Sequence, residues 1–282
     1  MSKLQSSIQK AIEKSRFQGH GKKERRKETT ASPTLRRSTD GLDSDVFRSL
    51  RSAILREDVM EDSRIVAATD DRTAKSAYNV LRTRVLQRLR SNNWNSILVT
   101  SAGSGEGKTL TASNLAMSLA RDVNQSAILV DLDLMRSSIA KYLGFDQDIE
   151  AGVGDFLQGN AGFSDILYSF GDFERLALIP NREPVENSSD LLGSPRMKEL
   201  IKHLHERPEE TIVVYDMPPV LAHDDVLAFC PNVDAILLVV AQGKTERAAL
   251  DKTMAVLSDY EMLGIVLNMS GDLASDSAYA YY

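Results

Sequence analysis

The stretch SILVTSAGSGEGKTLT, residues 96–111, decides the fold because an apolar strand runs in it directly into a glycine-rich loop and then into a helix. Its centre fits the phosphate-loop pattern, with Ala102 in the first glycine position. Closely spaced glycines let successive backbone N–H groups turn inward, and at a helix N-terminus such groups bind phosphate. The residues expected to contact a bound nucleotide are Gly103, Ser104, Gly105, Glu106, Gly107, Lys108, Thr109 and Leu110.

Two side chains at the end of this loop are expected to act on the nucleotide. Lys108 is expected to reach the β- and γ-phosphates, and the hydroxyl of Thr109 is expected to ligate Mg²⁺. The alternative interpretation is a glycine-rich turn before a helix. Because the strand, the loop, the Lys-Thr pair and the helix occur in the required order, the pattern favours ATP or ADP with Mg²⁺ as cofactors.

Acidic residues stand at the ends of two further apolar segments. The sequence AILVDLD, residues 127–133, contains Asp131 and Asp133, and alternation along an extended chain puts both on the same side. Asp216 closes the apolar segment at 211–215. A single such acid is as well explained by a helix cap or a solvated turn, but three of them beside a phosphate loop favour a metal and phosphoryl-transfer centre. The expected Mg²⁺ ligands are Thr109, Asp131, Asp133 and Asp216.

Around these motifs, apolar segments alternate with segments of helical spacing. Near-continuous Ile, Leu and Val strands separated by helices indicate an α/β fold with a mostly parallel central sheet and helices on both faces. Such sheets bind ligands beyond the carboxyl ends of their strands. Strands are predicted at residues 96–100, 127–131, 176–180, 211–215, 235–240 and 264–267, and helices at 73–91, 108–121, 195–206 and 245–260.

Composition limits the classes of protein that fit. A chain of 282 residues with 42% hydrophobic and 26% charged residues can bury one large α/β core. Residues 1–40 carry eleven Lys and Arg against four Asp and Glu, so 36 of the 40 acidic residues lie beyond them. An acidic body argues against a nucleic-acid partner for the folded domain. No apolar stretch approaches the ~20 residues of a membrane span, and the single Cys230 cannot form an internal disulfide, so a reducing cytoplasm is expected.

The same asymmetry predicts four segments. Residues 1–17 are expected to form an amphipathic helix with an apolar stripe that includes Leu4, Ile8 and Ile12. Residues 18–72 are rich in charged and small polar residues and are expected to be a polar, largely disordered linker. Residues 73–269 are expected to form the phosphate-loop domain. Residues 270–282 are expected to be a flexible tail that bears tyrosines.

Three motifs together resemble the bacterial tyrosine kinases, or BY-kinases: GEGKT at 105–109, DLD at 131–133 and DMPP at 216–219. SSDLLGSPRM at 188–197 and LGIVLN at 263–268 are similar to the family as well, and the resemblance covers about residues 74–282. Related partition ATPases usually have a lysine where this loop has Gly103, which favours the kinase branch.

The resemblance implies a protein-tyrosine autokinase that regulates capsule or exopolysaccharide export. It assigns phosphoryl transfer to Lys108, Asp131, Asp133 and Asp216, with Asp131 as our choice for the acceptor of the phenol proton. Asn268 would lie beside the adenine, although a strand-end turn residue is the alternative. The phosphoacceptors implied by the resemblance, modified in trans within a ring of subunits, are Tyr279, Tyr281 and Tyr282.

The resemblance also implies partners. A membrane co-polymerase, or chain-length regulator, would supply an activating cytoplasmic segment and recruit the protein to the inner face of the membrane. The alternative function is a nucleotide-switch ATPase that organises an export or positioning complex without phosphorylating tyrosine. That alternative is favoured by the segment SAYNVLR at 76–82, in which only Arg82 remains of the family's Glu and two Arg, and by Met135, where the family has a basic residue.

Overall fold

The computed structural model describes residues 50–207 and 210–271 and contains one eight-stranded sheet in the order β1-β4-β5-β3-β6-β2-β7-β8. The predicted helix at 1–17 and the three tail tyrosines lie outside the described residues. All strand pairs are parallel except β4 with β5, which confirms the predicted mostly parallel sheet. The strands are β1 (Arg51–Ala53), β2 (Ser96–Ser101), β3 (Ser126–Asp131), β4 (Tyr168–Phe170), β5 (Phe173–Ile179), β6 (Thr211–Asp216), β7 (Ala235–Ala241) and β8 (Met262–Asn268).

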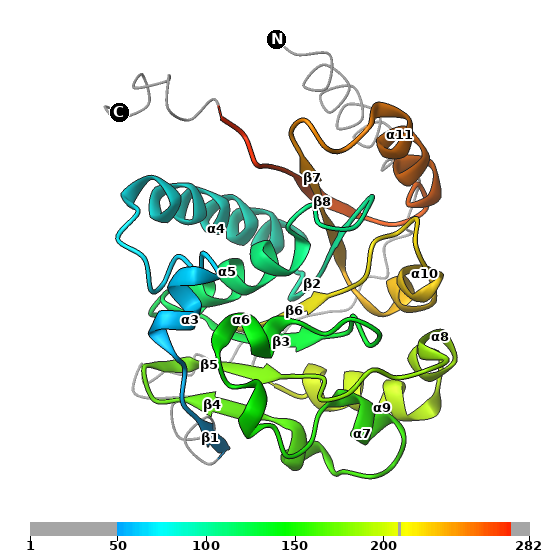
Figure 1. Ribbon diagram of the computed structural model, residues 1–282. Coiled ribbons are helices and arrows are strands. Elements are labelled where there is room, and N and C mark those ends of the chain that lie inside the picture. Colours follow the sequence, from blue (N-terminus) through cyan, green and yellow to red (C-terminus); the bar gives the residue numbers. More distant parts are fainter. Residues whose placement is uncertain (1–49, 208–209, 272–282) are drawn as a thin grey trace, which may run out of the picture.

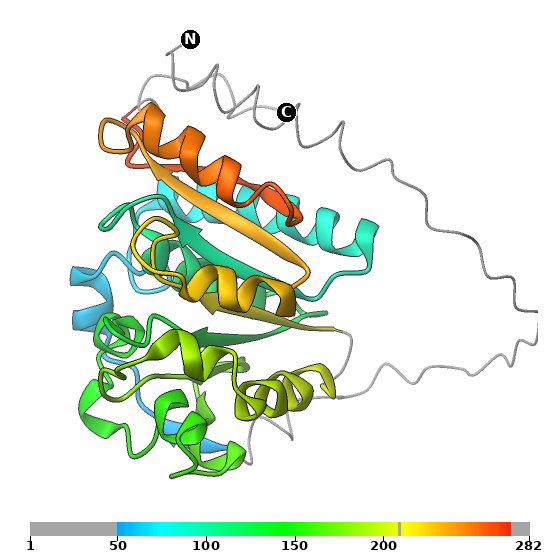
Figure 2. The ribbon, with the colours of Figure 1, turned by 90° about the vertical axis from the view of Figure 1, so that its right-hand side faces the viewer.

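Helices cover both faces of the sheet (Figure 1, Figure 2). Alternation along the strands produces the two layers: Ile97 and Val99 of β2 join one hydrophobic core, whereas Leu98 between them joins the other. The first core contains α3 (Glu57–Asp62), α4 (Arg72–Asn92), α5 (Lys108–Ala120) and α6 (Ile139–Leu143). The second contains α7 (Val153–Leu157), α8 (Ser188–Leu192), α9 (Pro195–His205) and α10 (Asp225–Phe229), and α11 (Arg247–Val256) packs beside it.

Helix α5 is the central helix of the first layer and follows the glycine-rich loop directly. Its sequence KTLTASNLAMSLA is rich in small residues, and it is buried along almost its whole length. Small side chains allow a helix to approach a sheet closely, so α5 contacts β2, β3, β5, β6 and β7. This packing fixes the N-terminus of α5, and with it the loop, over the middle of the sheet.

The prediction of a largely disordered linker over residues 18–72 is wrong near its end, where β1 and α3 form. Strand β1 pairs with β4 in parallel, and α3 follows it. Met60 and Ile65 are buried, and the backbone N–H of Val66 donates to Asn114 Oδ1 at 2.7 Å. These elements are short and gain their stability from residues far along the chain, so local composition did not reveal them.

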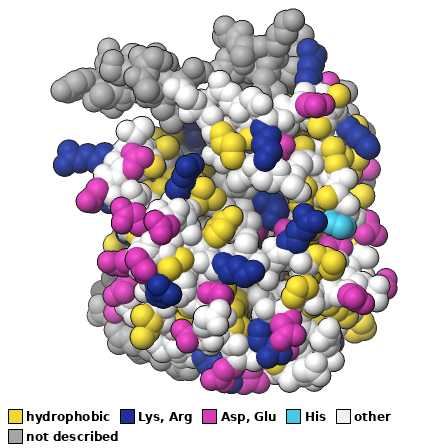
Figure 3. All heavy atoms as spheres, viewed as in Figure 1, with side chains coloured by type: hydrophobic (Ala, Val, Ile, Leu, Met, Phe, Trp, Pro, Cys, Tyr) yellow, Lys and Arg dark blue, Asp and Glu magenta, His cyan; other side chains and the backbone are white. Residues whose placement is uncertain are grey.

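The surface adds two observations. Figure 3 shows Lys and Arg side chains interspersed with Asp and Glu over the face seen in Figure 1, so this face presents no continuous patch of one charge. Among the helices of residues 50–207 and 210–271, none is long and apolar enough to cross a membrane.

Because the segment after β1 belongs to the fold, we predict that Ile65→Ala lowers the free energy of unfolding by about 2–5 kcal/mol, the usual cost of deleting a buried aliphatic side chain. Ile54→Ala is the matched control, since Ile54 is 79% exposed whereas Ile65 is 0% exposed. The control should change stability by about 0.5 kcal/mol or less. Denaturant unfolding measures both, and equal stability of the two variants would contradict the assignment.

Candidate active site

The three motifs meet at the middle of the sheet. Strands β3, β6 and β2 are neighbours in that order, and the register pairs Asp216 with both Asp131 and Val99. In a parallel sheet the carboxyl ends of adjacent strands lie at one edge, so the glycine-rich loop and the strand-end acids are brought together there. Figure 1 shows these three strands at the centre of the sheet.

Two glycines of the loop, Gly105 and Gly107, have backbone conformations that favour glycine, and side chains of neighbouring segments lie close to both. Gly105 and Gly107 have φ angles of 71° and 93°, in the left-handed region that side chains disfavour. A β-carbon at Gly105 would lie 2.4 Å from Lys244 Nζ, and one at Gly107 would lie 2.0 Å from Asn268 Nδ2. Gly107 is also the N-cap of α5, so the loop ends at a helix N-terminus, as a phosphate site requires.

The side chain of Glu106 stabilises the phosphate loop through hydrogen bonds. This side chain is buried, and Oε2 accepts a hydrogen bond from the backbone N–H of Ala102 at 3.0 Å. Oε1 accepts from the hydroxyl of Thr245 at 2.7 Å. Asn268 Nδ2 donates to the Glu106 carbonyl at 2.9 Å, so this predicted adenine-side residue does lie against the loop. The sequence did not single out Thr245 or its neighbour Lys244, because their contacts join segments 139 residues apart.

Lys108 lies among the acids. Its Nζ donates to Asp133 Oδ2 at 2.7 Å and to Thr109 Oγ1 at 3.1 Å, and Asp216 Oδ2 is 3.8 Å away. Burial acts to lower the pKa of Lys108, but the charges of Asp216 and Asp133 outweigh it and hold the pKa above its ordinary value. Lys108 therefore carries a full positive charge near neutral pH.

Asp131 and Asp133 have different partners because β3 ends at Asp131, and strand alternation does not extend to Asp133. Asp131 Oδ2 accepts from the backbone N–H groups of Ser138 and Ile139, at 3.1 and 3.2 Å. Burial, together with the charge of Asp216, raises the pKa of Asp131 to about 8. Burial also raises the pKa of Asp216 to about 6, against the opposing effect of Lys108.

The acids do not by themselves form a closed metal site. Within the described part of the chain, no three His, Cys, Asp or Glu side chains are grouped as a metal site. However, Asp131 Oδ1 and both side-chain oxygens of Asp216 are buried without a hydrogen-bond partner there. Mg²⁺ is commonly held by one or two carboxylates, waters and phosphate oxygens, and buried carboxylate oxygens without hydrogen-bond partners close to a phosphate loop suit such an ion. The donor set at this edge therefore fits Mg²⁺.

Two residues of the family motifs have contacts within the chain. The hydroxyl of Ser188 donates to the carboxylate of Asp225, at 2.8 and 2.9 Å to its two oxygens, and so links α8 to α10. Arg82 donates to the carbonyl of Ser118 at 3.1 Å. Arg82, the residue that remains of the family's charged helix motif, thus attaches α4 to α5.

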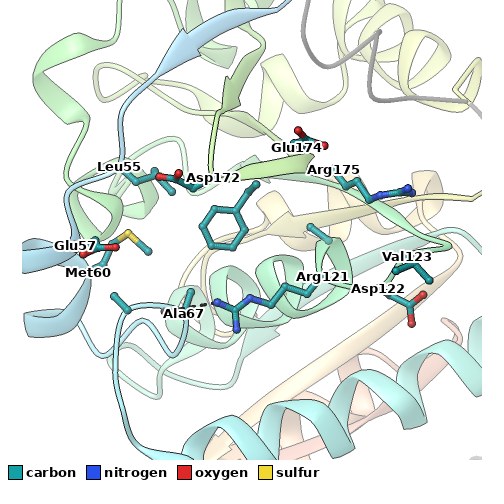
Figure 4. Close-up of a pocket in the computed structure, with 13 residues that line it drawn as sticks. Leu55, Glu57, Met60, Ala67, Arg121, Asp122, Val123, Asp172, Glu174 and Arg175 are labelled. Atoms are coloured by element: carbon teal, nitrogen blue, oxygen red, sulfur yellow. Dashed lines mark hydrogen bonds between the residues drawn. The ribbon is translucent and has the colours of Figure 1, made fainter. Parts of the chain in front are cut away.

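A separate pocket of about 490 Å³ lies at the other edge of the sheet. It is lined by the segment after β1, the end of α5 and the start of β5, and Figure 4 shows Arg121 pointing toward Ala67, whose carbonyl it reaches at 3.4 Å. Since residues 120–123 precede β3 and residues 172–175 begin β5, this pocket is at the amino-terminal ends of the strands. It is therefore remote from the phosphate loop.

Comparison with known proteins identifies the family. The model of the CobQ/CobB/MinD/ParA nucleotide binding domain matches residues 97–278. The tyrosine-protein kinase CpsD of Streptococcus pneumoniae is 30% identical over 197 residues, which cover 69% of this chain and 84% of that protein. The tyrosine-protein kinase YwqD of Bacillus subtilis is 28% identical over 230 residues, 77% of this chain and 90% of that protein.

Among solved structures, the kinase domain of Escherichia coli tyrosine kinase ETK superposes with a TM-score of 0.63 at 26% identity, covering 68% of this chain and 74% of that one. The region matched by the family model, residues 97–278, contains the phosphate loop and the strand-end acids described above. The family expected from the three motifs is thereby confirmed. The chain belongs to the bacterial tyrosine-protein kinases, and its nucleotide-binding domain to the CobQ/CobB/MinD/ParA family.

Proposed function

We propose that this kinase transfers the γ-phosphoryl group of ATP to tyrosines of its own C-terminal tail and thereby regulates capsule or exopolysaccharide export. The observation that carries the proposal is Lys108 held 2.7 Å from Asp133 and 3.8 Å from Asp216, directly beside the phosphate loop. A largely buried cation among acids, at the end of a glycine-rich loop, provides both charges that a metal-bound triphosphate needs.

In this mechanism the loop amides and Lys108 bind the phosphates, and Lys108 exchanges its contact with Asp133 for phosphate oxygens. Thr109, Asp131, Asp133 and Asp216 would hold Mg²⁺, which neutralises charge on the β- and γ-phosphates when it is bound. Asn268 lies against the loop at Glu106, which supports its assignment to the adenine side.

A tyrosine hydroxyl with an ordinary pKa of about 10 needs a nearby base to attack phosphorus. Asp131 is the proposed acceptor: as the phenol oxygen bonds to the γ-phosphorus and the bond to the ADP oxygen breaks, the phenol proton moves to Asp131. Its position supports this role, because Asp131 ends β3 beside the register partner Asp216 and its Oδ1 is buried without a hydrogen-bond partner among the described residues.

The acceptor is proposed to be the tail, at Tyr279, Tyr281 or Tyr282. Strand β8 ends at Asn268, beside the phosphate loop, so the chain leaves the domain at the edge of the active site. A segment of small and polar residues at that place can carry a tyrosine into the site of a neighbouring subunit. We retain modification in trans within a homo-oligomeric ring as the proposed arrangement.

The proposed partner is a membrane co-polymerase whose cytoplasmic segment activates the kinase. Recruitment by that partner would place the protein at the inner face of the membrane, and residues 1–17, with their predicted apolar stripe, are a candidate docking helix. The support for this partner and for recruitment to the membrane is the resemblance of the sequence to the family.

Replacing Lys108 by Met should abolish tail phosphorylation, because the variant keeps the length of the side chain and loses the charge on the phosphates. We expect a fall of at least about a hundredfold in phosphotyrosine, the scale seen when one preorganised stabilising group is lost. Mass spectrometry of the full chain made in its native cell measures it. Lys252→Met, an exposed lysine of α11, is the control. Equal labelling of the Lys108 variant would exclude this catalytic site.

Replacing Tyr279, Tyr281 and Tyr282 together by Phe should remove the phosphotyrosine while nucleotide binding is retained, since the rings stay and only the acceptor oxygens go. Tyr260→Phe, within the folded domain, is the matched control and should leave the label in place. If wild-type protein from export-active cells carries no phosphotyrosine on the tail, the nucleotide-switch function replaces the autokinase.

The raised pKa values of Asp131 and Asp216 predict a pH dependence of stability. Both carboxyls hold protons more tightly when folded than the ordinary pKa of about 3.9 allows when unfolded. The free energy of unfolding of the ligand-free protein should therefore fall as pH rises from about 4 to about 8. Asp131→Asn should show a smaller fall, and Asp259→Asn, at an exposed carboxyl, an unchanged one.

Bound ADP and Mg²⁺ should reduce the same fall, since a divalent cation favours the ionised carboxyls. Denaturant unfolding at a series of pH values, with and without ADP and Mg²⁺, provides the measurement. A wild-type stability that is flat or rising over pH 4–8, or a fall that is as large in Asp131→Asn as in the wild type, would contradict the assigned pKa directions.

A further inference from the structure

The loop between β7 and α11, residues 242–246, forms hydrogen bonds with the phosphate loop. Lys244 Nζ donates to the carbonyl of Gly105 at 2.9 Å, and the Thr245 hydroxyl donates to Glu106 Oε1 at 2.7 Å. We propose that Lys244 and Thr245 are positioning residues that hold the phosphate loop in its phosphate-binding shape, Thr245 acting through Glu106. The inference rests on nucleotide binding as described under the proposed function.

The hydroxyl of Thr245 has a fixed direction. The backbone N–H of Ala241 donates to Thr245 Oγ1 at 2.8 Å, which leaves the O–H proton free to point at Glu106. Glu106 in turn accepts from the N–H of Ala102 through its other oxygen. A continuous chain of hydrogen bonds therefore runs from the end of β7, through two buried side chains, to the start of the phosphate loop.

The contacts on the loop carbonyls set the direction of its amides. In a trans peptide the C=O of one residue and the N–H of the next point in opposite directions, and the described residues contain no cis peptide. Holding the Gly105 carbonyl toward Lys244 therefore turns the N–H of Glu106 the other way. Holding the Glu106 carbonyl toward Asn268 does the same for the N–H of Gly107. The N–H groups of Glu106 and Gly107 therefore point away from Lys244 and Asn268, and an anion cradle requires N–H groups that point to a common side.

Lys244 also adds charge. Its side chain is exposed, and among the described residues it forms no ion pair that would neutralise it. The loop itself, residues 101–109, contains the single lysine Lys108. Lys244 therefore brings a second ammonium group to the outer side of the loop, where its field favours a bound polyphosphate at low salt.

Removing the Thr245 hydroxyl leaves a buried oxygen of Glu106 without a partner, which is unfavourable enough to displace the side chain. We expect Thr245→Val to weaken the binding of ADP with Mg²⁺ about tenfold, a change that corresponds to loss of one such hydrogen bond. Thr245→Ser, which keeps the hydroxyl, should bind within about twofold of wild type, on the scale of a minor packing change.

Lys244→Met should weaken ADP binding about twofold to fivefold at low salt, the scale of an exposed charge interaction, and less at high salt, because the lost interaction is electrostatic. Lys244→Arg keeps a donor and the charge and should bind nearly as well as wild type. Titration calorimetry of the full chain with ADP and Mg²⁺ measures all four variants.

Two matched controls distinguish the loss of loop positioning from a nonspecific effect of substitution on the fold. Thr253 of α11 is also buried, but its hydroxyl has no hydrogen-bond partner among the described residues, so Thr253→Val should leave ADP affinity unchanged. Lys252→Met removes an exposed positive charge from α11 and should also bind normally. In addition, Thr245→Val made in a Glu106→Ala background should cost less affinity than it does alone, since Thr245 acts through Glu106.

The outcomes are distinguishable. If wild-type protein does not bind ADP, the proposed function fails. If wild type binds and Thr245→Val binds equally well, or if Thr253→Val weakens binding as much as Thr245→Val, the positioning role is overturned. A lower melting temperature of ligand-free Thr245→Val with unchanged ADP affinity would show a purely structural hydrogen bond and would also overturn it.

Discussion

The active site depends on the ion pairs that the ammonium group of Lys108 forms with the buried carboxylates of Asp133 and Asp216. Each charge would be costly to bury alone, so the lysine and the acids are compatible with the core only together. The arrangement requires that α5 begin at Lys108 and that β3, β6 and β2 be neighbours. The sheet order and the small residues of α5 are therefore conditions for the chemistry as much as for the fold.

The side chains of this cluster, Lys108 and the neighbouring acids, can form new contacts when nucleotide and Mg²⁺ bind. Lys108 is paired, whereas Asp131 Oδ1 and the side-chain oxygens of Asp216 are buried with no hydrogen-bond partner among the described residues. Bound Mg²⁺ and phosphate would offer new partners to both, since phosphate provides negative oxygens for the lysine and the cation provides a partner for the acids. Nucleotide binding would then satisfy these buried oxygens, in addition to forming the hydrogen bonds of the loop.

Sequence patterns predicted the parts of this structure in which local pattern and tertiary role agree. Strands β2, β3, β6 and β7 are continuous apolar runs, and their predicted bounds are within a residue of those observed. Strand β1 and helix α3 were missed because their few apolar residues pack against distant partners. Lys244 and Thr245 carry no local signal, because only the adjacency of β2 and β7 brings their loop to the phosphate loop. The alternation used to place Asp131 and Asp133 on one side does not extend to Asp133, because β3 ends at Asp131, although both acids lie near Lys108.

A crystal structure of the full chain with ADP and Mg²⁺ tests the central claim most directly. The account predicts that Lys108 Nζ leaves Asp133 for a phosphate oxygen, that a cation lies beside Thr109 and Asp216, and that Glu106 keeps its contacts with Ala102 and Thr245. Nucleotide bound elsewhere, or a bound phosphate with Lys108 still paired to Asp133 and no cation near Asp216, would contradict it.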